Sequence, residues 1–240
     1  GYRGKRDEEM RYLTAAFAAA GICVLIAGCG SGTTHGTKTT TTTTTTTTKA
    51  APPLMQGSLK GLILSPEQIN TVMGATDMSV TRKHDALSDD SATMRPRECL
   101  AIDGAAQAQI YAGSNFTDVL DEALQEGDNF THYAEQALVL FPSAKQADAF
   151  FTNSAKQWPA CHQYTHIQSG SEWTAGRVSN TNGVLSVTAT QQNANKGGWA
   201  CGRALAVRNN VIVDINTCSA DPANTAVVIA NQIAAKVSAQ

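Results

Sequence analysis

The stretch Trp199-Ala-Cys-Gly-Arg-Ala-Leu-Ala-Val-Arg-Asn-Asn-Val-Ile-Val-Asp-Ile-Asn-Thr-Cys218 decides the fold of this chain. It contains two runs typical of β-strands, separated only by Asn209 and Asn210. Asparagine tolerates the positive φ angles that two-residue hairpin turns require. The stretch therefore predicts an antiparallel hairpin in which Arg208 pairs with Val211.

The hairpin register predicts the disulfide pairing. Counting outward from the turn places Cys201 opposite Cys218, at a non-hydrogen-bonded position where side chains approach within disulfide range. With Cys99 and Cys161 they make four cysteines beyond the N-terminal region, and an even number indicates disulfides in an exported protein. The register therefore leaves Cys99 to pair with Cys161. A metal site is the weaker alternative, since no Cys-x-x-Cys spacing occurs.

One face of the hairpin carries the candidate binding residues. Arg203, Asp214 and Asn216 share the cysteine face, beside Trp199. Arg203 and Asp214 are diagonal neighbours that could form an ion pair. We expect these four residues to line a ligand cleft; the alternative is a solvated face with a surface ion pair worth little. The opposite face is small and apolar and is predicted to pack under a helix: Ala204, Ala206, Val211, Val213 and Ile215.

Three further stretches predict helices. In Ser65–Gly74, Ser65 suits the N-cap, Pro66 the first turn and Gly74 the exit. Apolar residues recur at helical spacing in Ser143–Trp158. The last helix is expected over Asp221–Val237, with Asp221 as its N-cap.

Short alternating or apolar runs predict the remaining strands, whereas residues 81–97 are expected to be a loop and Phe116–Glu126 is ambiguous between helix and strand. The predicted strands are Gln107–Gly113, Tyr133–Phe141, Tyr164–Gln168, Trp173–Val178 and Val184–Thr190. Strands with helices around them indicate an α+β fold: a single domain with an antiparallel β-sheet flanked by helices and two disulfides.

The N-terminal region predicts export and lipidation. Residues 12–27 are uncharged and too short for a membrane span, as expected for residues 1–28 being a signal peptide with its true start at Met10. The sequence Leu25-Ile-Ala-Gly-Cys29 resembles a lipobox, with small residues before a thiol that would form a thioether to diacylglycerol. We expect Cys29 to carry the lipid. An ordinary secretory signal or a single-pass anchor is the alternative.

Residues 29–57 are expected to form a tether between that lipid and a domain over 58–240. The segment includes ten consecutive threonines, Thr39–Thr48, and too few apolar side chains to offset the entropy of ordering. As a coil it would span roughly 30 Å. The threonines are candidate O-glycosylation sites, or a plain solvated spacer.

Composition and motifs argue against several function classes. The net charge of −2 and the lack of a basic block argue against nucleic acid as a partner. No hydrolase, metalloprotease or P-loop motif occurs, so neither an enzyme nor a cofactor is expected. His162 and His166 are expected to be an exposed polar pair rather than a metal or catalytic pair. Asp89-Asp90 and Asp121-Glu122 are expected to be surface charges.

Several short motifs together resemble one known family. The chain is similar to the PknH-like extracellular sensor domains of mycobacteria, including lipoproteins that carry this domain alone, over about residues 58–240. This resemblance implies an α+β sensor domain with two disulfides, paired in sequence order, and a cleft for a small ligand. It does not imply kinase activity. The motifs are Leu64-Ser-Pro-Glu-Gln-Ile-Asn70, Met73-Gly74, Glu98-Cys99-Leu100, Tyr111-Ala-Gly-Ser114, Phe141-Pro-Ser-Ala144, Ala149-Phe-Phe151, Trp158-Pro-Ala-Cys161, Gly198-Trp-Ala-Cys201 and Cys218.

These observations together predict a non-enzymatic sensor or binding domain held on the extracytoplasmic side of the cell membrane through Cys29. Its expected ligand is a small or lipid-like molecule. The second hypothesis is a module that binds another protein of the cell envelope, and the third is a hydrolase without a recognisable motif.

Overall fold

The computed structural model describes residues 49–240. The expected signal peptide, the lipidation site Cys29 and the threonine run Thr39–Thr48 lie outside the described residues. Within 49–240, no helix is both long and apolar enough to cross a membrane.

A ten-stranded antiparallel sheet forms the centre of the domain, in the order β1-β3-β4-β10-β9-β8-β6-β5-β2, with β7 paired to β8. Its central strands are β9 and β10, the two strands of the predicted hairpin. The strands are β1 (Ser79–His84), β2 (Met94–Arg95), β3 (Asp118–Gln125), β4 (Tyr133–Leu140), β5 (Gln163–His166), β6 (Glu172–Ala175), β7 (Ser179–Thr181), β8 (Val184–Gln191), β9 (Ala200–Arg208) and β10 (Val211–Ser219).

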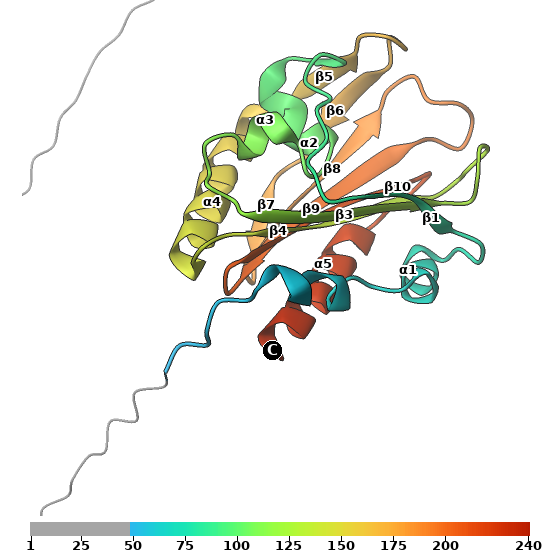
Figure 1. The fold of residues 1–240 in the computed structure, drawn as a ribbon. Coiled ribbons are helices and arrows are strands. Elements are labelled where there is room, and N and C mark those ends of the chain that lie inside the picture. Colours follow the sequence, from blue (N-terminus) through green and yellow to red (C-terminus); the bar gives the residue numbers. More distant parts are fainter. Residues whose placement is uncertain (1–48) are drawn as a thin grey trace, which may run out of the picture. The chain divides into compact units, whose positions relative to one another are not determined.

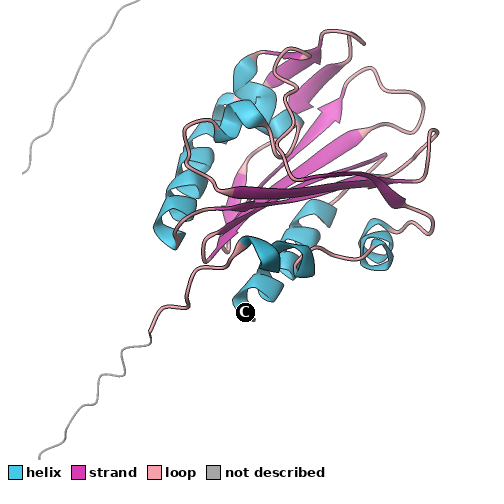
Figure 2. Cartoon of the chain, in the orientation of Figure 1, coloured by secondary structure: helices cyan, strands magenta, loops and turns pink. Residues whose placement is uncertain are grey.

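Helices cover both faces of the sheet (Figures 1 and 2). One face carries α2 (Leu100–Asp103), α3 (Ala108–Tyr111) and α4 (Ala144–Gln157), and the other carries α1 (Pro66–Met73) and α5 (Thr225–Ser238). Three 3₁₀ turns complete the fold: η1 (Gln56–Gly61), η2 (Arg97–Cys99) and η3 (Trp158–Ala160). The fold class is the expected one, with two apolar cores separated by the sheet.

The hairpin register is confirmed. Arg208 pairs with Val211 across the turn, and Cys201 pairs with Cys218 at the open end. The two disulfides are Cys201–Cys218 and Cys99–Cys161, as predicted. The small apolar face of the hairpin packs against α5, which brings Ile229, Ile233 and Ala230 onto it.

The predicted start of α1 is also confirmed. Ser65 accepts a hydrogen bond from the Gln68 backbone N–H, and the Gln68 side chain accepts one from the Ser65 backbone, which forms a capping box. Gly74 ends the helix with φ of 67°, a left-handed conformation that costs glycine little.

Two predictions of local structure are wrong, because exposed strands give no periodic signal and a four-residue helix is too short to be told from an alternating run. Residues 81–97 are not a loop throughout: they contain β2 and most of β1, edge strands whose residues are mostly exposed. Gln107–Gly113 is not a strand: its centre forms the short helix α3, which turns the ring of Tyr111 into the core. The ambiguous Phe116–Glu126 segment contains β3.

The N-cap of the last helix is also wrong, since α5 begins at Thr225 after Asn224. Asp221 instead accepts a hydrogen bond from the Ala223 N–H in a tight turn that puts Ala223 at φ of 45°. Because the Asp221 carboxylate accepts this hydrogen bond in an Asx turn, it does not cap the helix.

The packed region starts ahead of Ser58, the expected boundary. Leu54 lies in the core, and its backbone N–H and C=O both bond to the buried side chain of Asn210 at the hairpin turn. Asn209 donates to the Pro52 C=O in the same way. The turn therefore fixes the point at which the chain enters the fold.

Removing the two disulfides should have unequal effects. The Cys99–Cys161 disulfide closes a loop between cysteines 62 residues apart. Replacing both cysteines by serine opens this loop and should lower the free energy of unfolding by about 4 kcal/mol at 25 °C, on the loop-entropy model. Replacing Cys201 and Cys218 opens a separation of 17 residues and should cost about 3 kcal/mol. Urea unfolding of both double variants measures this order, and the reverse order would contradict it.

Candidate functional site

A cleft opens on the sheet beside the Cys201–Cys218 disulfide, with a volume of about 350 Å³. The hairpin supplies its floor, because Asn216 lies on the same face of β10 as Cys218. Its walls come from β6, the start of β4 and the segment between β1 and α3. Aromatic lining residues are Phe130, Tyr133, Trp173 and Trp199, and polar lining residues are Asp90, Thr93, Asp103, His166 and Asn216.

The aromatic rings form a continuous wall. Phe130 and Trp199 meet edge to face, with their centroids 6.0 Å apart, and Phe130 lies 6.4 Å from Tyr133. A second hollow of about 380 Å³ shares Phe130 and Trp199 and adds amide side chains from residues 191–195. The two hollows thus form one site around the Phe130–Trp199 pair.

Asn216 brings a side-chain amide with spare hydrogen-bonding capacity to this cleft. It is only 5 % exposed, and its side-chain N–H groups donate to no other residue in the described part of the chain. Its Oδ1 contacts Cys218 Sγ, a disulfide sulfur that has no proton to donate. Buried amides are normally hydrogen-bonded, so this carboxamide is available to a ligand.

His166 and Asp103 form the charged part of the cleft. The His166 Nε2 lies 2.5 Å from Asp103 Oδ1, and this contact raises the pKa of His166 above its ordinary 6.5. No lysine or arginine is among the residues lining either hollow. The lining therefore offers aromatic surface and hydrogen-bonding groups but no fixed partner for an anion.

The structure divides the four predicted ligand residues into two pairs. Trp199 and Asn216 come together in the cleft. Arg203 and Asp214 lie under the helices instead, 2 % and 3 % exposed, and do not line the cleft. Their ion pair does form, at 2.7 Å, but it is buried rather than on a solvated face.

Every nitrogen of Arg203 and every carboxylate oxygen of Asp214 has a hydrogen-bond partner. Arg203 also donates to the backbone C=O of Ala101 and of Ile215, and the Trp158 ring lies 5.3 Å from its guanidinium carbon. Asp214 accepts from the Ala106 N–H and from the hydroxyl of Tyr111. Burial and Asp214 raise the pKa of Tyr111 well above its usual range, so the phenol stays a donor.

The expected surface charges Asp121 and Glu122 are another correction, because both are buried. Their side chains leave β3 on opposite faces: Asp121 meets Arg82 at 3.1 Å and Glu122 meets Lys83 at 3.3 Å. Arg82 also binds Glu135 at 2.6 Å.

This cluster raises the pKa of a carboxyl group next to the cleft. Burial, with the neighbouring Asp121 carboxylate, raises the pKa of Glu135 to about 8. Tyr133, which lines the cleft, donates to Glu135 at 3.1 Å. The raised pKa of Glu135 favours its protonated form and so lowers the negative charge behind Tyr133.

The histidine prediction holds for one residue only. His162 is exposed, whereas His166 is partly buried in the cleft and bound to Asp103. Among residues 49–240, no three His, Cys, Asp or Glu side chains are arranged to hold a metal ion. Sequence reasoning missed Phe130, Tyr133, Trp173 and Asp103, which reach the cleft from four separate segments.

Comparison with known proteins identifies relatives of this domain. The family model of the PknH-like extracellular domain matches residues 54–236. Serine/threonine-protein kinase PknH from Mycobacterium bovis and from Mycobacterium tuberculosis H37Rv are each 33% identical over 190 residues. The match covers 77% of this chain but only 32% and 30% of those kinases. The chain therefore spans about a third of their length.

A solved structure agrees with these matches. The crystal structure of the extracellular domain of PknH from Mycobacterium tuberculosis superposes with a TM-score of 0.74 and 32% sequence identity. The superposition covers 79% of this chain and 99% of that one.

The His166–Asp103 pair should give stability a specific pH dependence. A raised folded-state pKa means that the folded protein binds the proton more tightly, so this contribution is fully present below the ordinary pKa of 6.5 and is lost as pH rises through the higher folded value. Asp103→Asn should therefore lower the pKa of His166 and remove this part of the stability.

The measurement is an NMR titration of the histidine ring protons, together with urea unfolding between about pH 5 and pH 8. The parent protein, titrated under the same conditions, is the control. An unchanged His166 pKa in Asp103→Asn would contradict the pairing.

Proposed function

Because the chain belongs to the PknH-like extracellular domain family, we propose that it is a non-enzymatic, extracytoplasmic binding domain that takes a small or lipid-like ligand in the cleft beside Cys201–Cys218. One observation carries the proposal: the side chain of Asn216, only 5 % exposed, brings N–H groups with no acceptor among residues 49–240 to the floor of an aromatic cleft. Ligand sites combine apolar walls with a few placed polar groups in this way.

The ligand chemistry follows from the lining. Phe130 and Trp199 offer ring faces and edges to an apolar part of the ligand, and Asn216 offers both a donor and an acceptor. Without lysine or arginine in the lining, an anionic group would lose hydration without gaining a partner. Arg203 and Asp214 act beneath the cleft, by fixing the helices that border it.

The side-chain arrangements favour binding over hydrolysis. The arrangement in residues 49–240 that most resembles a catalytic triad is Thr131, His132 and Glu126. The Thr131 hydroxyl and the Glu126 carboxylate both contact the same nitrogen, His132 Nδ1. A catalytic base needs one ring nitrogen for the nucleophile and the other for the carboxylate. This group therefore lacks the geometry of a nucleophile–base pair.

A protein-binding role is the second candidate and receives less support. The large exposed apolar residues of the described region are Met55, Val80 and Ile167. Met55 directly precedes η1, Val80 lies in β1 and Ile167 follows β5. Since β1 and β5 are at opposite sides of the sheet, these residues do not make one patch. Interfaces between proteins commonly use a contiguous apolar surface.

Membrane attachment through Cys29 is part of this proposal. The lipobox-like residues 25–29 support a diacylglycerol anchor, and the threonine-containing segment supports a tether that holds the domain away from the lipid. The match to the extracellular domain of the kinase PknH supports an extracytoplasmic position for this domain.

Loss of the cleft residues should release the ligand. Protein purified from its own host should carry a ligand visible by native mass spectrometry, and Trp199→Ala or Asn216→Ala should weaken its binding at least about tenfold. Asn216→Ala should barely change stability, because the amide has no partner to lose. Asn180→Ala, on an exposed strand, is the matched control. Full ligand retention in both cleft variants would refute the site.

Changing Cys29 should separate anchoring from binding. Cys29→Ser should lose the lipid and leave the membrane fraction, or remain as the unprocessed precursor, whereas Cys23→Ser should be lipidated normally. Metabolic labelling with a fatty acid and membrane fractionation measure this. A Cys29→Ser protein that is still acylated and membrane-bound would contradict the anchor.

A further inference from the structure

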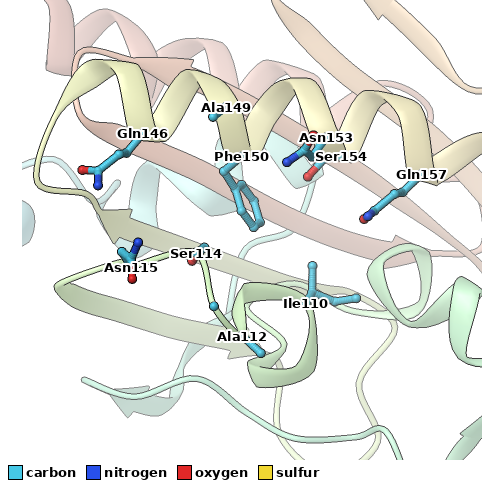
Figure 3. Close-up of a pocket in the computed structure, with 11 residues that line it drawn as sticks. Ile110, Ala112, Ser114, Asn115, Gln146, Ala149, Phe150, Asn153, Ser154 and Gln157 are labelled. Atoms are coloured by element: carbon cyan, nitrogen blue, oxygen red, sulfur yellow. The ribbon is translucent and has the colours of Figure 1, made fainter.

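A separate hollow, apart from the site around Phe130 and Trp199, lies between α4 and the loop after α3 and has a volume of about 370 Å³. Figure 3 shows α4 along one side and residues 110–115 along the other, with side chains from both entering the space between them. It shares no lining residue with the cleft beside the disulfide. We refer to it as the α4 groove.

The α4 groove is lined entirely by uncharged residues. Four of them carry primary amides: Gln146, Asn153 and Gln157 from α4, and Asn115 from the facing loop. The three on α4 recur at helical spacing and so share one side of the helix.

The charged residues of the same helix lie elsewhere. Lys145, Asp148 and Lys156 are exposed on α4 but do not line the groove. A solvated helix surface normally mixes charged and polar residues, because charge contributes to solubility. The separation of amides from charges on one helix therefore needs an explanation beyond solvation.

A rigid aromatic floor lies beneath the amides. The side chain of Phe150 enters the groove, and its ring stacks on Tyr111 with centroids 4.2 Å apart and planes 13° apart. Tyr111 is held in turn by its hydrogen bond to Asp214. The floor is thus fixed by the buried ion pair rather than free to collapse into the groove.

The facing loop presents an unsatisfied hydroxyl. The Oγ of Ser114 is buried and has no hydrogen-bond partner in the described part of the chain. Gly113 and Asn115 on either side have φ of 74° and 63°, so the backbone holds left-handed conformations at this wall of the groove. Buried polar atoms without a partner are uncommon in folded proteins, so the Ser114 hydroxyl is available to a ligand.

We propose that the α4 groove is a binding site for a neutral, polyhydroxylated ligand, a saccharide. Primary amides and hydroxyls each donate and accept hydrogen bonds, as sugar hydroxyls do. A charged ligand would lose hydration and find no opposite charge in the lining. The volume is near the small end of ligand pockets, which suits one or two sugar rings.

An extended peptide is a poorer fit for the α4 groove. Peptides that bind through their backbone usually pair with an open strand edge. None of the residues lining this groove belongs to a strand. Peptide binding is therefore an outcome that would count against the proposal.

The test is an NMR titration of the isotope-labelled protein with probes matched in size. Maltose and cellobiose are the neutral probes, glucosamine and glucuronate carry opposite charges, and an N-acetylated, C-amidated dipeptide stands for a peptide. Residues 110–115 and 146–157 should shift with a neutral disaccharide, and less with either charged sugar. Failure of both disaccharides to shift these residues, equal binding of a charged sugar, or preference for the dipeptide would overturn the proposal.

Variants locate the binding and separate it from the cleft. Asn153→Ala with Gln157→Ala should weaken disaccharide binding at least about tenfold, because each removes a donor and an acceptor. Lys145→Ala with Lys156→Ala is the control on the same helix and should bind as the parent does. Trp199→Ala should also leave disaccharide binding unchanged. Loss of binding in either of these last two variants would place the sugar elsewhere.

Discussion

The helix layer formed by α2 and α3 depends on one buried ion pair, Arg203 with Asp214. Two charges removed from water are costly unless they are paired and their remaining hydrogen-bonding capacity is met. Here it is met from outside the hairpin by the backbone of Ala101 and Ala106 and by the Tyr111 hydroxyl. The need to satisfy these charges therefore fixes α2, α3 and the link between them over the sheet.

Both hollows depend on the groups that this pair holds. On one side, Arg203 binds α2 at Ala101, and the same short helix ends at Asp103, which orients His166 in the cleft. On the other side, Asp214 binds Tyr111, whose ring supports Phe150 under α4. The two sites have no lining residue in common, yet their walls are positioned from neighbouring strands of one hairpin.

The sequence predicts what depends on local geometry. A two-residue turn and an alternating pattern define the β9–β10 register, and that register puts Cys201 opposite Cys218. The cap of α1 is equally local. The edge strands β1 and β2 lack an alternating pattern because solvent surrounds most of their side chains. Asp121 and Glu122 look like surface charges until Arg82 and Lys83, from an unrecognised strand, are placed beside them. The cleft could not be predicted from the sequence for the same reason. Its residues Phe130, Tyr133, Trp173 and Asp103 come together only when the whole sheet has assembled.

The bonds between Asn210 and Leu54 have a consequence for orientation. They fasten the incoming chain to the turn end of the central hairpin, whereas the Cys201–Cys218 pair and the cleft lie at its open end. The strand between them, from Arg208 to Cys201, extends about 23 Å at the usual rise per residue. The mouth of the cleft therefore lies about one strand length away from the point at which Pro52 meets the hairpin turn. A force applied to the chain at Pro52 would load the turn first, whereas the Cys201–Cys218 disulfide ties the two strands together at the end that carries the cleft.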